Sequence, residues 1–344
     1  MVQDIRNFTL KELEARFVKM GVERYRAAQV FKWVYAKGVE DFGRMTDLPA
    51  GMRGRIAEHF SLEEGVIEKA QEAPDGVVKL LLRLKDGAHI ESAAIPLADH
   101  WTACLSTQVG CRFRCAFCAS GSLGFVRNLS AAEIVTQMTA LRRHAAGQAG
   151  RVSHAVFMGV GEPLDNYDNL LRAVRIMNDE KGLRLGMRKM TVSTCGLSDA
   201  IRRLAGEGLE LELSVSLHAA TDAKRAELLP VDRLYPLKTL IPAVKTYIEE
   251  TGRKVTFEYV LLGSYNTSVE DARALVKLAR GMNVKINLIA YNETRTRAAF
   301  EPPTKLEAFF FRDYLTRHGI DVTLRRPRGG AVAAACGQLR AQGM

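Results

Sequence analysis

The sequence predicts an α/β fold: a partial (β/α)6 barrel that follows a small N-terminal helical domain and a β-meander. After Trp101, apolar extended runs alternate with helical patterns, which is typical of a parallel sheet with helices outside it. Polar residues stand at the ends of successive runs, where barrel enzymes place their functional side chains. The first hundred residues lack this alternation, so we expect separate elements there.

Length and composition agree with this organisation. The 344 residues are 47% hydrophobic, which is enough for one large domain and a small appendage. Lys and Arg number 49 against 39 Asp and Glu, and the net charge of +10 suits a polyanionic partner or serves solubility alone. No run of about 18 apolar residues predicts a membrane span. Because the first residues begin no apolar signal segment, we expect a cytoplasmic protein.

Residues 1–62 predict a helical domain that docks RNA. Thr9 and Glu12 form a capping box at the start of a helix over 10–20. A second segment with helical apolar spacing covers 25–37 and ends at Gly38. Basic residues on this segment favour contact with RNA, although a solvated face explains such residues more often. They are Arg24, Arg26, Lys32 and Lys37.

The later segments follow in order. Residues 63–100 predict a β-meander, with extended runs over 77–84 and 88–96 that Asp-Gly turns precede. Residues 101–328 predict the barrel, whose first helix opens with a capping box of Ser130 and Glu133. Its strands are expected at 102–106, 152–158, 189–193, 209–217, 254–262, 285–289 and, shorter, 320–325. Residues 329–344 form a C-terminal segment that carries Cys336.

Three of the six cysteines form a C-x3-C-x2-C motif directly after the first barrel strand: Cys111, Cys115 and Cys118. Six cysteines in a chain of this length point to metal binding or catalysis rather than to a disulfide framework. Three thiolates on one loop can bind three irons of a 4Fe–4S cluster and leave the fourth iron open to a chelating ligand. A structural zinc site is the alternative, but zinc takes four ligands and no neighbouring His or Cys offers the fourth.

Glycine and polar residues follow the later barrel strands, and we expect them to meet at one mouth. Glycine lets the backbone approach a ligand closely, and Glu162 can hold an ammonium group. A glycine turn alone fits a structural turn equally well, and His218 alone fits a buried core histidine. Together, at the ends of successive strands, they favour a ligand site. The set is Gly161, Glu162, Ser193, Ser216, Leu217, His218 and Asn292.

The cysteine motif, with its place after the first strand, resembles the radical S-adenosylmethionine (SAM) superfamily. The resemblance implies one 4Fe–4S cluster with three cysteine ligands, and SAM bound to the open iron. It also implies that an electron cleaves SAM to a 5′-deoxyadenosyl radical. An external donor such as flavodoxin or ferredoxin would supply that electron.

Further motifs resemble the RlmN/Cfr family of radical methyltransferases over nearly the whole chain. They are GFVRNL at 124–129, GEP at 161–163, SLH at 216–218, LLP at 228–230 and ACGQL at 335–339. The order and spacing are those of the family. The resemblance implies that the seven residues of the barrel mouth contact SAM, and that each turnover uses two SAM molecules.

The same resemblance implies roles for three residues outside the cluster motif. Cys336 matches the thiol that takes a methyl group from SAM and, as a methylene radical, adds it to an adenine ring carbon. Cys104 matches the thiol that resolves this linkage and leaves a Cys104–Cys336 disulfide, which is then reduced. Glu91 matches the carboxylate that accepts the ring proton. Cys195 stands where the family often has serine, and we interpret it as structural.

We therefore expect a monomeric enzyme that methylates carbon 2 of an adenosine in 23S rRNA, and of an adenosine beside the tRNA anticodon. Pro163 and Val109 match the carbon-2 branch of the family, whereas the carbon-8 branch, which confers antibiotic resistance, tends to carry Ala and Cys there. Carbon-8 methylation, or another RNA adenosine, is the nearest alternative, because residues 293–300 and 332–334 depart from the family pattern. A non-catalytic metal-containing RNA-binding protein is an alternative of another class, and it would give Cys104 and Cys336 no role.

Overall fold

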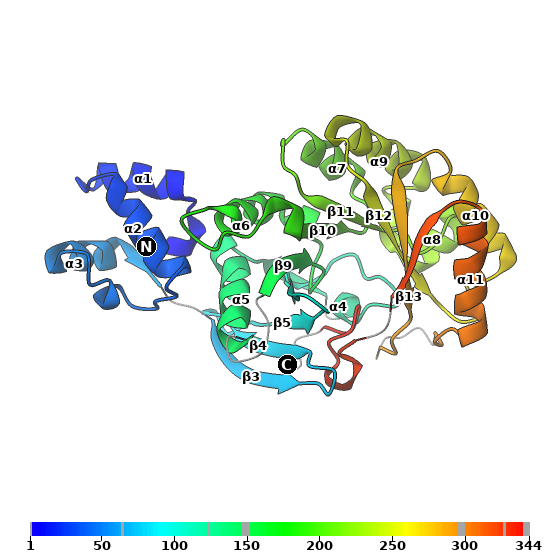
Figure 1. Ribbon diagram of the computed structural model, residues 1–344, viewed down its shortest axis with the longest axis horizontal. Coiled ribbons are helices and arrows are strands. Elements are labelled where there is room, and N and C mark those ends of the chain that lie inside the picture. Colours follow the sequence, from blue (N-terminus) through cyan, green and yellow to red (C-terminus); the bar gives the residue numbers. More distant parts are fainter. Residues whose placement is uncertain are drawn as a thin grey trace.

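The computed structural model of the chain describes residues 2–62, 65–122, 124–145, 152–294, 300–325 and 328–339. Figure 1 shows a curved sheet flanked by helices, with a group of N-terminal helices at one end. Within the described residues the main sheet runs in the order β14-β13-β12-β11-β10-β9-β6-β5-β4-β3. The predicted α/β class is confirmed.

Parallel strands form the barrel part of this sheet, in sequence order, with ends that differ by only a few residues from the predicted ones. Because parallel strands present their C-terminal ends at one edge, the residues that follow them share one mouth. The strands are β6 (Trp101–Cys104), β9 (Val152–Phe157), β10 (Met190–Thr194), β11 (Glu212–Ser216), β12 (Val255–Leu261), β13 (Val284–Ala290) and β14 (Asp321–Arg325).

The meander extends the barrel sheet. It consists of β3 (Val66–Glu72), β4 (Val78–Arg83) and β5 (His89–Pro96), which pair antiparallel. The sequence indicated β4 and β5 but not β3, whose side chains are mostly exposed. Strand β5 pairs antiparallel with β6, with Ala93 opposite Cys104. Since alternate residues of a strand share a face, Glu91 lies on the same face of the sheet as Cys104.

Helices cover the outer side of the barrel strands (Figure 1). Ser130 and Glu133 form the predicted capping box at the start of α5. One continuous apolar core joins these helices to the sheet and reaches into the N-terminal helices. The barrel helices are α5 (Ala131–His144), α6 (Tyr167–Asn178), α7 (Ser198–Ala205), α8 (Asp222–Leu228), α9 (Leu237–Thr251), α10 (Val269–Ala279) and α11 (Lys305–Arg317).

The N-terminal helices α1 (Leu10–Lys19), α2 (Tyr25–Tyr35) and α3 (Ala50–His59) pack beside α5 and α6 (Figure 1). The expected capping box at Thr9 is present. Asn7 accepts a hydrogen bond from the backbone of Ala132 at 3.0 Å, and Arg172 lies 3.3 Å from Glu12. These contacts attach the N-terminal helices to the barrel. Among the described residues we find no helix whose length and hydrophobicity would let it span a bilayer.

A buried arginine ties the ends of the barrel strands to helix α8. Arg225 is fully buried and forms an ion pair with Asp232. Its guanidinium also donates to the backbone oxygen of Cys195 at 2.7 Å. Because Cys195 directly follows β10, this hydrogen bond fixes part of the barrel mouth.

Replacing Arg225 with Met should lower the free energy of unfolding by about 3–5 kcal/mol, because Asp232 would lose its buried partner. Urea denaturation of the variant and the wild-type chain measures the loss. Arg188→Met is the matched control, since Arg188 pairs with Glu210 on the surface, and its effect should be far smaller. Equal losses in the two variants would contradict the structural role of Arg225.

Candidate active site

The cysteine motif lies on a loop that leaves strand β7 (Gln108–Gly110), passes through the short helix α4 (Ala119–Ser122) and returns as β8 (Phe125–Asn128). Gly110 has a φ of 72°, and a Cβ there would lie 1.7 Å from the backbone oxygen of Gly124. The backbone N–H of Cys111 donates to that same oxygen at 2.8 Å. Only glycine therefore allows the turn that carries Cys111 into the motif.

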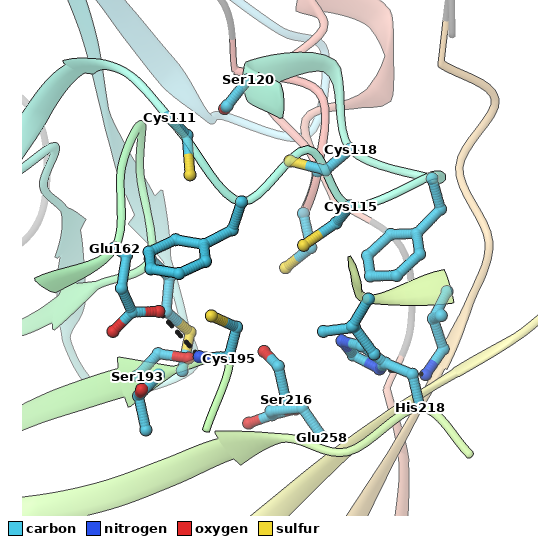
Figure 2. A pocket seen from close by; sticks show the side chains of 18 of the residues that line it. Cys111, Cys115, Cys118, Ser120, Glu162, Ser193, Cys195, Ser216, His218 and Glu258 are labelled. Carbon is cyan, nitrogen blue, oxygen red and sulfur yellow. Dashed lines mark hydrogen bonds between the residues drawn. The ribbon is translucent and has the colours of Figure 1, made fainter. Parts of the chain in front are cut away.

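Cys111, Cys115 and Cys118 line one pocket, and Figure 2 shows their side chains around a common space. All three are free thiols. Burial, followed by the neighbouring thiols, raises the pKa of Cys111 to about 12 and that of Cys115 well above its ordinary value. A cation would have to stabilise their thiolate forms before they could act as ligands.

The donor set fits an iron–sulfur cluster. Three soft sulfur donors meet in one pocket, and soft thiolate ligands are those that iron–sulfur clusters take. The same pocket is lined by polar residues from the barrel strands, which could contact an organic ligand beside the cluster. In the described residues no trio of His, Cys, Asp or Glu is arranged to hold a single metal ion. A cluster is wider than one ion and takes donors that stand further apart.

Polar residues from the ends of successive barrel strands line the same pocket, as the sequence predicted. Those that share its wall are Gly161, Glu162, Ser193, Ser216, His218 and Asn292. Leu217 differs from them, because its side chain is fully buried in the core and forms no part of the wall. The loop after Asn292 includes residues 295–299, which lie outside the described residues.

Glu162 is fixed in the pocket wall beside the cysteine loop. Its Oε2 accepts a hydrogen bond from the backbone N–H of Cys195 at 2.7 Å, and its Oε1 accepts one from Leu164 at 3.0 Å. Gly161, with a φ of 108°, lets this loop approach Gln108, whose Cβ would lie 2.6 Å from an added Cβ. Burial raises the pKa of Glu162, and the two N–H donors oppose that rise. A bound ammonium group would favour the charged carboxylate in the same way.

His218 is a neutral part of the wall. Its Nδ1 accepts a hydrogen bond from the backbone N–H of Val260 at 3.0 Å, and its ring packs edge-on against Phe117 with centroids 4.7 Å apart. Burial, together with the Arg225 guanidinium, lowers the pKa of His218 to about 3. With Nδ1 occupied as an acceptor, the neutral ring carries its hydrogen on Nε2 and can only donate from there.

Cys195, interpreted from the sequence as structural, lies in the pocket wall. It lines the same pocket as the motif cysteines, and Figure 2 shows it beside Glu162. Its backbone N–H positions the Glu162 carboxyl, as described above. Burial raises the pKa of its thiol well above the ordinary value.

The C-terminal segment folds against the cysteine loop. The backbone N–H of Ala119 donates to the oxygen of Gly337 at 2.8 Å, and the Ser120 hydroxyl donates to the oxygen of Leu339 at 2.7 Å. At its other end, Gly329 donates to Asp75 of the meander at 2.8 Å. These bonds bring Cys336 into the lining of the pocket.

Cys104 lies close to Cys336. It sits on β6 in a small apolar cluster with Ala93, Ala334 and Leu339, two of which belong to the C-terminal segment. Burial raises the pKa of Cys104 to about 12, and the nearby Cys336 thiol adds to the rise. Both residues are free thiols, so the two cysteines are neighbours in their reduced form.

Glu91 lies outside the pocket that the motif cysteines line. It is 3% exposed and forms an ion pair with Lys79, with 3.0 Å between Nζ and Oε1. Lys79 faces Ala93 across β4 and β5, and Ala93 faces Cys104 across β5 and β6. The carboxyl of Glu91 thus lies on the same face of the sheet as Cys104, two residues before Ala93 on β5.

The basic residues of α2 differ in their surroundings. Arg24 pairs with Glu14 at 2.6 Å, and Arg26 is half-buried. Lys32 is exposed on α2, and Lys37 is exposed two residues beyond the end of the helix, with its ammonium over the Trp33 ring. These two lysines are therefore the better candidates for contact with a phosphate backbone.

Sequence reasoning missed two charged residues of the pocket, Glu258 on β12 and Arg325 on β14. Glu258 is the acidic residue of an otherwise mostly apolar buried strand, Val255–Leu261, and this exception is the signal that could have identified it. Arg325 gave no comparable signal, because it ends a strand with alternating exposure.

Two family profiles match the chain. Residues 3–62 match the "Ribosomal RNA large subunit methyltransferase N-terminal domain", and residues 105–279 match the "Radical SAM superfamily". The second match contains the cysteine motif and most of the pocket wall.

Full-length relatives agree with these profiles. A protein of Symbiobacterium thermophilum named "Probable dual-specificity RNA methyltransferase RlmN" is 43% identical over 98% of this chain and 91% of its own length. A protein of the same name from Geobacillus thermodenitrificans is 42% identical over 98% of this chain and 93% of its own length. The crystal structure of a radical SAM methyltransferase from Sphaerobacter thermophilus matches with a TM-score of 0.95 and 42% identity, over 99% of this chain and 100% of that one.

Proposed function

Because the chain belongs to the RlmN family of radical SAM dual-specificity RNA methyltransferases, we propose that it methylates carbon 2 of an adenosine in 23S rRNA and of one beside the tRNA anticodon. Pro163 stands at a position where the carbon-2 and carbon-8 branches of the family differ, and it lies in the pocket wall. Its place supports carbon 2 as the target. We further propose that the enzyme acts as a monomer.

The observation that carries the proposal is the neighbourhood of Cys336, Cys104 and the cysteine motif. Carbon 2 of adenine is electrophilic and has no lone pair, so it cannot attack a methyl sulfonium. A thiol can be methylated by displacement and can then carry the carbon, which is covalent catalysis. Cys336 lines the pocket of the motif cysteines, and Cys104 lies next to it.

Cys111, Cys115 and Cys118 would hold the 4Fe–4S cluster. When bound there, the cluster and SAM supply the electron, the hydrogen-abstracting radical and the methyl group. Glu162, held by two backbone N–H groups, would bind the amino group of SAM. The hydroxyls and amide of the other mouth residues would orient the rest of that ligand.

Cys336 and Cys104 differ in ways that suit different steps. Cys336 lines the pocket, so a methyl donor and a target base that enter the pocket would meet its sulfur, although burial raises the pKa of this thiol too. Cys104 is buried among apolar side chains, and burial raises its pKa, so its thiol must lose a proton before it can attack the linkage to Cys336. The attack would form a Cys104–Cys336 disulfide, which an external donor such as flavodoxin or ferredoxin would reduce.

Glu91 would accept the proton that leaves the ring carbon. It shares a sheet face with Cys104, and its ion pair with Lys79 holds the carboxylate in place. Because Glu91 is buried, the target base can approach its carboxylate only when the residues that cover it move aside. This requirement would couple proton transfer to the entry of the RNA.

Residues 1–62 would dock the RNA through Lys32 on α2 and Lys37 just after the helix. Their charges offer phosphate contacts at a distance from the pocket, so they would fix the register of the RNA without reading its sequence. The target adenosine must leave its stack to reach a recessed pocket.

Cys118→Ala should abolish the cluster and the cleavage of SAM, while the barrel stays folded. Iron and acid-labile sulfide on anaerobically purified protein measure the cluster, and about four irons per chain are expected for the wild type. Cys195→Ser is the matched control, because Cys195 positions Glu162 through its backbone, and it should keep the full iron content. Normal SAM cleavage by Cys118→Ala would refute the cluster assignment.

Cys336→Ala and Cys104→Ala should fail at opposite ends of one cycle. Cys336→Ala should lose the methyl mass on the peptide 335–339 and all RNA methylation, yet keep the cluster. Cys104→Ala should accumulate RNA attached through Cys336, because no thiol can then attack the linkage. Peptide mass spectrometry and denaturing gels report both outcomes. Turnover by Cys336→Ala would remove the carrier mechanism.

Charge reversal of Lys32 and Lys37 to Glu should weaken RNA binding, because two phosphate contacts become repulsive. Filter binding at several salt concentrations should show a log–log slope reduced by roughly one for each lysine. Lys238→Glu with Lys245→Glu, on α9 at the other end of the molecule, is the control (Figure 1). If both pairs had the same effect, the N-terminal helices would not be the docking site.

A further inference from the structure

Glu258 carries a buried oxygen that lacks a hydrogen-bond partner. The residue is 4% exposed and lines the pocket of the motif cysteines. Its Oε1 accepts hydrogen bonds from the Ser214 hydroxyl at 3.2 Å and from the Asn287 amide at 3.1 Å. Its Oε2 has no partner among the described residues. Buried polar atoms are almost always paired, so an unpaired oxygen in a pocket wall indicates a donor that arrives with a ligand.

The neighbours of Glu258 fix its carboxyl in one orientation. Ser214, Glu258 and Asn287 come from three adjacent strands, β11, β12 and β13, and Arg325 on β14 approaches Oε1 to 3.9 Å. All of these partners engage Oε1. Two hydrogen bonds and a nearby cation on Oε1 hold the carboxyl in one orientation and leave the buried Oε2 without a donor, which is the arrangement of a prepared acceptor.

The position of Glu258 indicates which ligand group it meets. It lies directly opposite Ser216, and Figure 2 shows the two side chains close together on the barrel floor, across the pocket from the motif cysteines. Glu162, Ser193, Ser216 and Glu258 therefore come from four successive strands around the pocket. The amino-acid end of SAM would occupy the Glu162 side, so the next part of the molecule, its ribose, would reach Ser216 and Glu258.

We propose that Glu258 is a cofactor-binding residue whose Oε2 accepts a hydrogen bond from a ribose hydroxyl of SAM; this rests on the proposed function. A ribose offers two adjacent O–H donors, and a carboxyl oxygen is the acceptor that dinucleotide-binding folds use for the same group. Phe157, Val260 and Ile289, which line the same pocket, are apolar, so the acceptors for the ribose come from the polar residues at the strand ends. Glu258 would thus select a ribosyl ligand over its deoxy analogues.

The test measures binding of S-adenosylhomocysteine, which keeps the ribose but lacks the sulfonium charge, to anaerobic holoenzyme by isothermal titration calorimetry. Glu258→Ala should weaken binding about tenfold or more, the effect of losing a hydrogen bond to a charged group. The matched control is Glu212→Gln on the neighbouring strand, whose carboxyl pairs with Arg253 and does not line the pocket. Its affinity should equal that of the wild type.

Analogues of the same ligand without the 2′- or the 3′-hydroxyl complete the cycle. The wild type should lose about tenfold or more in affinity for one of them, whereas Glu258→Ala should bind the parent and that analogue equally. Equal affinity of the wild type for all three ligands would overturn the proposal, whether or not the variant folds. So would a Glu258→Ala loss that is the same for every ligand.

Two further outcomes separate the sources of the hydroxyl. In the first outcome, Glu258→Gln leaves the affinity for S-adenosylhomocysteine unchanged but weakens the binding of RNA whose target adenosine has a 2′-hydroxyl, and not of RNA with a 2′-deoxy target. The ribose that Glu258 contacts would then belong to the RNA, and the proposal would be wrong. If the wild type bound the cofactor analogue with the expected hydroxyl dependence but methylated no RNA, the proposed function would fail and the role of Glu258 would stand.

Discussion

The rest of the site depends on the docking of the C-terminal segment against the cysteine loop. Two hydrogen bonds form this contact, one from Ala119 to Gly337 and one from Ser120 to Leu339. Ser120 and Leu339 are 219 residues apart in the sequence. These hydrogen bonds help to fix Cys336, because the described part of its segment, residues 329–339, contributes no strand or long helix of its own. The same docking packs Ala334 and Leu339 into the apolar cluster of Cys104 on β6, so it brings Cys336 close to a thiol that the sheet already holds.

Burial sets the chemistry of this site as much as geometry does. The pKa values of Cys104, Cys111, Cys115 and Glu162 are all raised, and that of His218 is lowered, with burial as the first cause in each case. Each of these shifts favours the uncharged form of its group. A bound cation, such as iron or a sulfonium, would therefore be needed to stabilise the charged thiolates and carboxylate.

Polar atoms of the pocket are positioned at some expense to stability. The buried Glu258 oxygen without a partner would be better satisfied outside the protein, and the fold keeps it because Ser214 and Asn287 hold the carboxyl. Arg225, by contrast, stabilises the fold. Its buried guanidinium forms an ion pair with Asp232 and donates a hydrogen bond to the backbone oxygen of Cys195. Such local conflicts with stability are expected at functional sites.

The sequence by itself determined the barrel, its strand order and the motif cysteines, because alternating strands and helices and a C-x3-C-x2-C spacing are local patterns. It also identified Glu162, Ser193, Ser216, His218 and Asn292 as wall residues, since parallel strands bring their ends to one mouth. Only the tertiary structure decided that Leu217 faces the core, that Glu91 pairs with Lys79, and that the meander continues the barrel sheet. It alone revealed Cys195 and Glu258 in the pocket. These features depend on contacts between distant segments, and no local spacing records which buried polar atom is left without a partner.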